Sequence, residues 1–413
     1  MIGYPMNVTD CYECGYFRAG GHFTCQKHPH PHYVDHPTDD PLARYSVPCP
    51  VDWRNPDGKD IHCNSFEEYD GFIQIFIHML RVFTAFSGYD SQCMALDQIG
   101  INYDLVGWSE IDKFAIEAHN RFFPQYKDRN LGDISKIDWD KTPDFDLFTY
   151  SSPCQDFSRA GLMRGGQENS GTRSSLLWEC RKAIQAKRPK YLILENVSDL
   201  VSHKFFPLFK AWMEDLENMG YENHWQVLNA SEHNVPQNRR RVFLVSIRKF
   251  DFPAVVPLEN TLDKILESQV DERYYINADK IDCILKDQPS EDILLVRQAT
   301  KKGFIEVNKG GLFDSTFPKS KTRRGRVQGN GGDISPTLTA SASDCILRFE
   351  GFKDGKPIIR RLTEREIFRF MGVRDEKIDQ IQESKIGSRQ QGKLAGNSIV
   401  VDVLAAVFKN LLT

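Results

Sequence analysis

Cys154 stands in segment 153–158, which closely follows a short apolar run at 145–150. That run predicts a buried strand, and a second apolar run at 191–197 carries a carboxylate, Glu195. Because parallel strands of an α/β sheet end at one edge, where ligands bind, we expect the thiol and the carboxylate close together. There they could serve as a nucleophile and an acid on one substrate. Taken singly, the cysteine could also be inert and buried, and the glutamate an ordinary strand-end carboxylate.

A second set of polar side chains precedes another apolar run, 242–247. It consists of Gln237, Arg239 and Arg241. A planar guanidinium suits a carbonyl oxygen or a phosphate better than a lysine ammonium does. Three consecutive arginines, 239–241, are by themselves more often a solvated patch.

The elements that must position these residues alternate along the chain. Further strands are predicted at 79–86 and 105–110, each followed by helical sequence. This alternation predicts an α/β fold with a doubly wound parallel sheet. The first of these strands ends at segment 86–88, which contains a glycine, and the second ends at Glu110. The glycine lets the backbone approach a cofactor, and the carboxylate can accept hydrogen bonds from ribose hydroxyls. Such turns are nevertheless frequent in α/β proteins.

The alternation stops before residues 252–350, which predict either an irregular second domain or a long insertion. A helix is expected at 361–371, with Thr363 as its N-cap and Glu366 completing a capping box. Apolar residues at helical spacing over 398–412 predict a closing helix that packs on the first domain.

Composition excludes several classes of protein. The chain has 413 residues, 40% hydrophobic and 27% charged, with a formal net charge of −4, which argues against a generic polycation. No apolar run approaches the ~20 residues that span a bilayer, and the N-terminus lacks a signal-peptide pattern. We therefore expect a cytoplasmic protein with no membrane partner. Ten cysteines without dense spacing favour a reducing compartment.

Residues 1–70 differ from the rest and predict a Cys/His-rich N-terminal module. Cys11 and Cys14 form a Cys-x2-Cys pair, and Cys25 and Cys49 follow. Four such thiolates are compatible with a tetrahedral structural zinc site. The alternative is a few reduced cysteines in a loop.

Together these motifs resemble the DNA cytosine-5 methyltransferase family of prokaryotes and phages, in the family's order from about Phe83 to Val401. The resemblance implies a Rossmann-like class I sheet that uses S-adenosylmethionine. It also implies a catalytic and cofactor-binding domain at 71–251 and a smaller, irregular target-recognition domain at 252–385. A C-terminal segment, 386–413, would return to the catalytic domain.

By this resemblance, a methyl group passes from S-adenosylmethionine to C5 of a flipped-out cytosine in a specific double-stranded DNA sequence. Cys154 would form a covalent bond to C6 and Glu195 would act as the acid. Arg239 and Arg241 would meet the cytosine carbonyl and order the catalytic loop, with Gln237 in the same motif.

The resemblance also implies a set of cofactor-binding residues: Phe86, Ser87, Gly88, Glu110, Ile111, Asp133, Ile134, Pro153, Asn397 and Ser398. The chain departs from the family's Phe-x-Gly-x-Gly turn, because Asp90 stands where the second glycine is usual. The cofactor contacts at that turn are therefore left open.

A target cytosine must leave the duplex to reach a thiol, so the recognition segment should grip DNA. The expected DNA contacts are Ser158, Arg323, Arg324 and Arg326, although the basic run could instead be a solvated loop. We expect a monomer bound to double-stranded DNA, in restriction–modification or in phage or host DNA modification. A cognate restriction endonuclease would act independently.

Two other functions remain open at this point. One is methylation of tRNA by the same fold, as in one branch of the family. The other is a DNA-binding protein with a degenerate catalytic site, for which Asp90 is the sole support.

Overall fold

A computed structural model describes residues 79–153, 176–277, 285–286, 292–298, 301–317, 320 and 325–413. The part that it describes belongs to one compact unit, Met79–Thr413. Several predicted site residues lie outside the described residues: Cys11, Cys14, Cys25, Cys49, Cys154, Ser158, Arg323 and Arg324. The domain boundaries at 70, 251 and 385 stay predictions.

The larger sheet has six strands in the order β2-β1-β3-β4-β6-β5. Their bounds are β1 (Leu80–Ala85), β2 (Tyr103–Ser109), β3 (Leu147–Tyr150), β4 (Tyr191–Val197), β5 (Asn223–Asn229) and β6 (Arg240–Ser246). β1 to β4 pair in parallel, whereas β6 runs antiparallel to both β4 and β5. The sheet is thus mixed: the predicted parallel order holds for β1 to β4, and β5 and β6 depart from it.

The reason lies in the connection between β5 and β6. It carries only one short 3-10 turn, η6 (Ala230–Glu232). A parallel neighbour would need a crossover of a dozen or more residues, usually containing a helix. The short connection instead reverses the chain.

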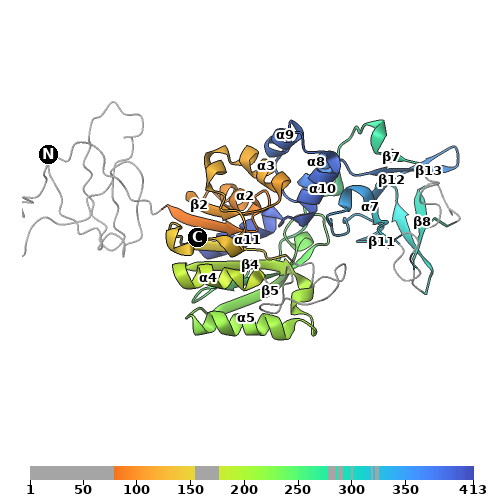
Figure 1. Ribbon diagram of the computed structural model, residues 1–413. Coiled ribbons are helices and arrows are strands. Elements are labelled where there is room, and N and C mark those ends of the chain that lie inside the picture. Colours follow the sequence, from red (N-terminus) through yellow and green to blue (C-terminus); the bar gives the residue numbers. More distant parts are fainter. Residues whose placement is uncertain are drawn as a thin grey trace, which may run out of the picture. The chain divides into compact units, whose positions relative to one another are not determined.

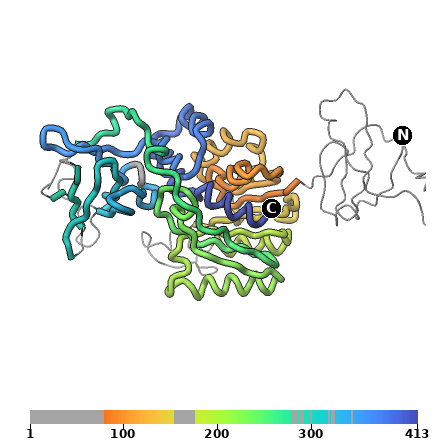
Figure 2. Tube along the Cα trace, turned by 180° about the vertical axis from the view of Figure 1, so that it is seen from behind, coloured from red at the N-terminus to blue at the C-terminus, as the bar shows by residue number. Residues whose placement is uncertain are grey.

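Helices cover both faces of this sheet. Alternate strand residues divide between two cores, with Val82 and Leu147 in one and Phe83 and Phe148 in the other, as the period of a strand requires. The first core includes side chains of α2 (Ser91–Gln98), α3 (Lys113–Phe122) and α11 (Val401–Leu412). The second includes α4 (Glu179–Lys187) and α5 (Phe206–Asn218), which lie away from α2 and α3 in Figures 1 and 2.

The expected irregular region contains ordered strands. A five-stranded antiparallel sheet has the order β11-β10-β12-β13-β7, and β8 pairs with β9. The bounds are β7 (Tyr275–Ile276), β8 (Ile293–Arg297), β9 (Phe304–Asn308), β10 (Leu312–Asp314), β11 (Arg326–Val327), β12 (Ile346–Lys353) and β13 (Lys356–Arg361). Several of these strands are too short to show a period in the sequence, which explains the missed prediction. They share a core around Phe313, Leu347 and Phe349.

The remaining elements are short. The helices are α6 (Leu262–Ile265), α7 (Ala342–Cys345), α8 (Glu364–Arg369), α9 (Asp375–Gln382) and α10 (Ser388–Asn397). The 3-10 turns are η1 (Pro124–Arg129), η2 (Ile134–Lys136), η3 (Trp139–Lys141), η5 (Ser198–Val201) and η7 (Glu272–Tyr274). The capping box of Thr363 and Glu366 is confirmed. The helix begins at Glu364 rather than Arg361 because Arg361 is the last residue of β13.

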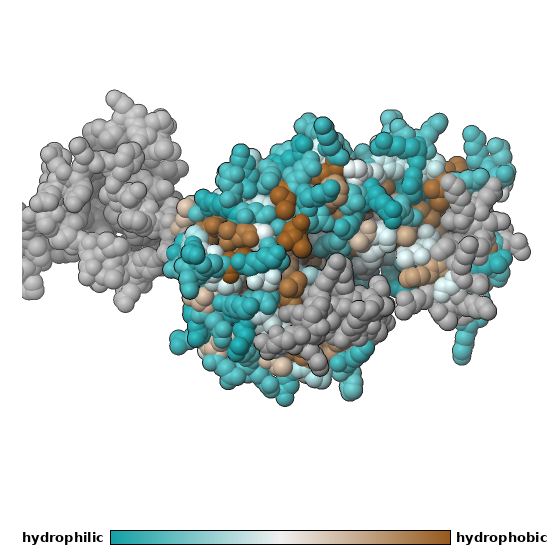
Figure 3. Space-filling model, viewed as in Figure 1, coloured by the Kyte–Doolittle hydropathy of each residue, from teal (hydrophilic) through white to brown (hydrophobic). Residues whose placement is uncertain are grey.

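The closing helix is confirmed as α11, and α10 precedes it without having been predicted. Among the described residues, Ser388–Leu412 is the one stretch that passes a test of length and apolarity for membrane spans. It is interrupted between α10 and α11, and 61% of its apolar window is buried inside the protein. It therefore packs as core. The face drawn in Figure 3 is mainly hydrophilic, with scattered apolar patches.

Candidate active site

Three predicted site segments meet at the carboxyl edge of the larger sheet. Tyr150 pairs with Leu194, so the residues that follow them continue side by side from β3 and β4. The Asn196 Nδ2 donates a hydrogen bond of 3.1 Å to the Ser152 carbonyl oxygen. The Ser151 hydroxyl lies 3.5 Å from the carbonyl oxygen of Phe86, at the end of β1. Hence the start of the segment that leads to Cys154 is held between β4 and residues 86–88, the predicted cofactor turn.

Glu195 is buried at this edge, with 7% of its surface exposed. Its Oε1 lies 3.2 Å from the Arg241 Nε, because β6 runs beside β4 and brings the two side chains together. Burial raises the pKa of Glu195, and the charges of Arg241 and Arg239 oppose that rise without cancelling it. A carboxyl group with a raised pKa can hold and deliver a proton.

Arg241 keeps part of its guanidinium accessible. Its side chain is 18% exposed, and its Nη1 donates to the Arg240 carbonyl oxygen at 2.8 Å. A guanidinium fixed by a carboxylate and a backbone carbonyl is pre-oriented, so it could donate to a further oxygen at this edge.

Arg239 has a different environment. It is buried and donates to three backbone carbonyl oxygens: Leu338 at 2.6 Å, Gly396 at 3.1 Å and Ser398 at 2.5 Å. These bonds join the start of β6 to two segments near the end of the chain. The predicted contact of Arg239 with a cytosine carbonyl stays a prediction.

Gln237 is wholly buried and also ties distant segments together. Its Nε2 donates to the Phe370 carbonyl oxygen at 2.9 Å, and its Oε1 accepts from the Leu338 N–H at 3.0 Å. The sequence motif thus brings Gln237, Arg239 and Arg241 together, but their partners differ.

The predicted cofactor turn is hydrogen-bonded to Glu110. Its Oε2 accepts from the Gly88 N–H at 2.9 Å, and its Oε1 accepts from the backbone N–H groups of Ile111 and Asp112. Phe86 and Gly88 have positive φ angles of 55° and 58°. No described atom lies within 4 Å of the place that a Cβ would occupy on Gly88. This open space beside a glycine fits close approach of a ligand to backbone.

The remaining cofactor-side residues differ in exposure. Ile111 is 72% exposed, whereas the Ile134 side chain is buried in the core and can offer a ligand only its backbone. Asp133 accepts from the Ser135 hydroxyl and N–H, and these bonds lower its pKa. The exposed apolar side chain of Ile111 and the carboxylates of Glu110 and Asp133 have the chemistry to contact the base and the hydroxyls of an adenosine.

The C-terminal segment reaches the same turn. The Ser398 hydroxyl is hydrogen-bonded to the Ser91 hydroxyl at the start of α2, and the neighbouring Asn397 is exposed. The Lys393 ammonium lies 2.9 Å from the Asp112 carboxylate, one residue beyond Ile111. Sequence reasoning missed Ser91, Lys393 and Asp112, which carry no motif signal of their own.

The described cysteines do not compete with Cys154 as a nucleophile. They are Cys93, Cys180 and Cys345. Burial raises the pKa of each thiol, and most strongly for the two that are fully buried. A raised pKa suppresses the thiolate that a nucleophile needs.

On the recognition side, Arg326 is exposed at the start of β11. Nearby, the Gln328 Oε1 accepts from the Asn238 Nδ2 at 2.9 Å, which joins β11 to the arginine motif. No group of three or more His, Cys, Asp or Glu side chains in the described ranges could hold a metal ion. The zinc site at Cys11, Cys14, Cys25 and Cys49 lies outside those ranges and stays a prediction.

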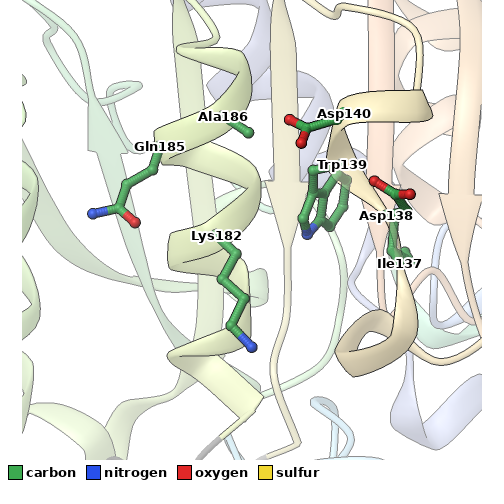
Figure 4. Close-up of a pocket in the computed structure, with 7 residues that line it drawn as sticks. All are labelled: Ile137, Asp138, Trp139, Asp140, Lys182, Gln185 and Ala186. Atoms are coloured by element: carbon green, nitrogen blue, oxygen red, sulfur yellow. The ribbon is translucent and has the colours of Figure 1, made fainter.

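Two surface hollows lie elsewhere. One, of about 450 Å³, lies between α4 and the η3 segment and is lined by Trp139, Lys182 and their neighbours, as Figure 4 shows. Another, of about 510 Å³, is lined by residues that include Tyr274, Glu364 and Gln391. Neither has a predicted site residue in its lining.

Comparisons with known proteins agree with this geometry. The model of the family described as C-5 cytosine-specific DNA methylase matches residues 80–413. The type II methyltransferase M2.ScrFI of Lactococcus lactis subsp. cremoris is 34% identical, over 81% of this chain and 99% of that protein. The orphan methyltransferase M.SPRI of Bacillus phage SPR is 29% identical, over 81% and 97%.

Solved structures of similar fold include an Entamoeba histolytica methyltransferase, EhMeth, at a TM-score of 0.60 and 16% identity, over 81% of this chain and 99% of that one. The Dnmt2 methyltransferase of S. pombe has a TM-score of 0.56 and 16% identity, over 81% and 100%. At these identities the likeness concerns the fold alone.

Proposed function

Since the chain belongs to the C-5 cytosine-specific DNA methylase family, we propose how it works as a DNA cytosine-5 methyltransferase that uses S-adenosylmethionine. Its substrate is a cytosine flipped out of a specific double-stranded sequence. The reaction proceeds through a covalent bond between Cys154 and C6 of that cytosine. The observation that carries this proposal is the buried Glu195, whose pKa is raised, beside Arg241 at the sheet edge where the segment leading to Cys154 begins.

The chemistry requires a nucleophile because C5 of an aromatic cytosine is barely nucleophilic. The Cys154 thiolate adds to C6, and the electron pair displaced from the ring gives C5 enamine character. S-adenosylmethionine supplies a methyl group on a sulfonium sulfur, which keeps the bonding electron pair when the methyl moves to C5. A base then takes the C5 proton, and the returning electrons expel the thiolate from C6.

Glu195 lowers the barrier to the first step. As C6 is attacked, negative charge develops on the ring, and a proton or hydrogen bond given to N3 drains it. The burial that raises the pKa of Glu195 keeps that proton available, and Arg241 fixes the carboxyl group in place. We assign Arg241 to the cytosine carbonyl oxygen, since its guanidinium is both oriented and partly accessible.

Gln237 and Arg239 act differently in this proposal. Their polar atoms reach backbone groups of Leu338, Phe370, Gly396 and Ser398. We assign them as positioning residues, which hold β6 and therefore Arg241 against Glu195.

We assign the cofactor site to three places: the 86–88 turn with Glu110 and Ile111, the segment at Asp133 with the backbone of Ile134, and the segment at Asn397 and Ser398. Pro153 borders it as the residue before the nucleophile. Glu110 would accept hydrogen bonds from the ribose, and Ile111 would pack against the adenine.

DNA would be held by Ser158, Arg323, Arg324 and Arg326. Contacts to the DNA phosphates would supply affinity, and one or two of the arginines would read guanine edges. We propose a monomer in the cytoplasm, working in a restriction–modification system or in phage or host DNA modification. A cognate endonuclease would act separately. Asp90 no longer favours a degenerate site, because its side chain caps α2 and each of its carboxylate oxygens accepts a hydrogen bond.

The test is bisulfite sequencing of DNA from cells that express the full chain, with Cys154→Ala expressed at the same level as the matched control. We expect methylated cytosines in one sequence context with the wild type and none with Cys154→Ala. Unmethylated DNA despite folded wild-type protein would contradict the proposal. Equal methylation by Cys154→Ala would contradict the nucleophile, and methylated tRNA with unmethylated DNA would point to the RNA substrate.

A further inference from the structure

The turn between β1 and α2 carries an aspartate in an unusual backbone conformation. Asp90 has φ 70° and ψ 60°, the left-handed region, and it is wholly buried. Two residues before it, Gly88 is also left-handed, and so is Phe86. Side chains of L residues resist this conformation at a cost of about 1–2 kcal/mol each, although Asp resists it less than most. Something must therefore hold Asp90 in place.

The carboxylate of Asp90 supplies part of that restraint. Its Oδ1 accepts from the Cys93 N–H at 3.1 Å, which caps α2. Its Oδ2 accepts from the Thr84 hydroxyl of β1 at 3.0 Å. Its backbone N–H donates to the Ser87 carbonyl oxygen at 2.8 Å. Asp90 thus joins β1 to α2 through its side chain and is tied to the turn through its backbone N–H.

His119 of α3 packs against the same carboxylate. Its Nε2 lies 3.4 Å from the Asp90 Oδ2, and both side chains have no exposed surface. The His119 ring stacks on Trp108 at a centroid distance of 3.7 Å and an interplanar angle of 20°. The stack fixes the imidazole against the carboxylate.

These contacts close a ring around the cofactor turn. Trp108 lies on β2 two residues before Glu110, and Glu110 accepts from the Gly88 N–H at 2.9 Å. The turn is thus held on one side by Glu110 and on the other by Asp90 through His119 and Trp108. Figure 1 shows that the elements that supply this ring, β2, α2 and α3, lie together.

We propose that Asp90 and His119 form a buried clamp that positions the 86–90 turn for S-adenosylmethionine, in place of the glycine usual at residue 90. The inference rests on the proposed function. A glycine adopts the left-handed region freely but offers neither a cap nor a partner. This chain obtains the same backbone path through side-chain contacts, which also hold the Gly88 N–H toward Glu110. Asp90 and His119 are positioning residues and touch no ligand themselves.

The experiment measures S-adenosylmethionine binding by calorimetry on the full chain without DNA, with urea unfolding as a separate readout. Asp90→Ala removes the clamp and leaves a side chain that strains the left-handed turn. We expect its Kd to rise by about tenfold or more. Asp90→Gly should recover part of that loss because glycine relieves the strain. Asp90→Asn and His119→Gln should each weaken binding by about threefold, since the first leaves one acceptor oxygen where the carboxylate has two, and the second removes the ring that lies against both the carboxylate and Trp108.

Glu214→Gln is the matched control, because Glu214 is an exposed carboxylate of α5, a helix that packs on the other face of the sheet. Its Kd should match the wild type. The inference is overturned if Asp90→Ala and His119→Gln, folded at the temperature used, bind as tightly as the wild type. If Asp90→Ala does not fold, His119→Gln alone decides by the same criterion. Failure of the wild type to bind S-adenosylmethionine would instead overturn the proposed function, and the inference with it.

Discussion

Two pairs of residues lie at or just before β6 and on the neighbouring strand β4, yet the two pairs occupy different environments. Glu195 and Arg241 pair with each other at the sheet edge, and part of the Arg241 guanidinium stays accessible. Gln237 and Arg239 are buried, and their polar atoms reach backbone groups 99 to 159 residues away. Matching a sequence motif thus identifies which residues gather, whereas their partners indicate what each one does.

The difference predicts two kinds of mutant. A change in the Glu195–Arg241 pair should lower the rate of methyl transfer and leave stability nearly unchanged. A change in the Gln237–Arg239 pair should lower the free energy of unfolding, because buried backbone groups lose their partners.

The largest expected effect is that of Glu195→Gln, which removes the acid but keeps the shape. Loss of general acid catalysis should lower the single-turnover rate by about 10²–10⁴-fold, measured with a tritiated methyl donor and duplex DNA. Glu214→Gln, an exposed carboxylate of α5, is the control and should change the rate by less than about twofold. A Glu195→Gln variant that transfers methyl groups as fast as the control would contradict the assignment of Glu195 as the acid.

Gln237→Ala tests the other pair. It leaves the Phe370 carbonyl and the Leu338 N–H without their partner in the interior, which should cost about 2 kcal/mol of unfolding free energy. Urea unfolding measures this. Arg240→Ala, an exposed neighbour, should cost less than about 0.5 kcal/mol. Equal stability of the two variants would show that Gln237 does not support the fold.

Thr363→Ala probes the opposite end of α8, the helix whose last turn Gln237 holds. Loss of the capping hydrogen bond should cost about 1 kcal/mol, and Thr363→Ser should recover most of it. Thermal unfolding followed by circular dichroism distinguishes them. Methyl transfer by either variant should stay close to the wild-type rate. A large loss of rate in Thr363→Ser would instead show that α8 takes part in catalysis.

The smallest effect concerns pH. Burial raises the pKa of Glu195, so between its unfolded and folded pKa values the folded state binds the proton more readily. The resulting stability is fully present below the unfolded pKa and is lost as pH rises through the folded pKa. Glu195→Gln lacks this dependence. The stability of the wild type relative to Glu195→Gln should therefore fall from acidic to neutral pH in urea unfolding, and parallel curves would contradict it.

Sequence alone predicted those elements whose residues carry a period or a cap. The apolar runs of β1 to β4 and β6, the capping box at Thr363 and the stripe of α11 all appear in the structure. β5 was missed because its sequence, NHWQVLN, alternates polar and apolar side chains only weakly at the edge of the sheet. The strands of the smaller sheet were missed because several span only two or three residues.

The site shows the same limit. Family order placed Glu195 and Arg241 together, and the structure brings them within 3.2 Å. No local pattern could reveal that Arg239 donates to Leu338, Gly396 and Ser398, since those contacts form only when distant segments fold together. Likewise, the sequence at Asp90 shows only that the usual glycine is absent, whereas the bonds of its carboxylate to Cys93 and Thr84 form only in the folded chain.

The most direct test compares Arg241→Gln with Arg239→Gln in matched preparations, measuring the single-turnover rate of methyl transfer and the unfolding free energy of each. We expect Arg241→Gln to lose about 10²–10³-fold in rate with nearly wild-type stability. We expect Arg239→Gln to lose about 3 kcal/mol of stability and, while folded, to transfer methyl groups within about threefold of the wild-type rate. The reverse assignment, with a stable but inactive Arg239→Gln and a destabilised but active Arg241→Gln, would contradict the account.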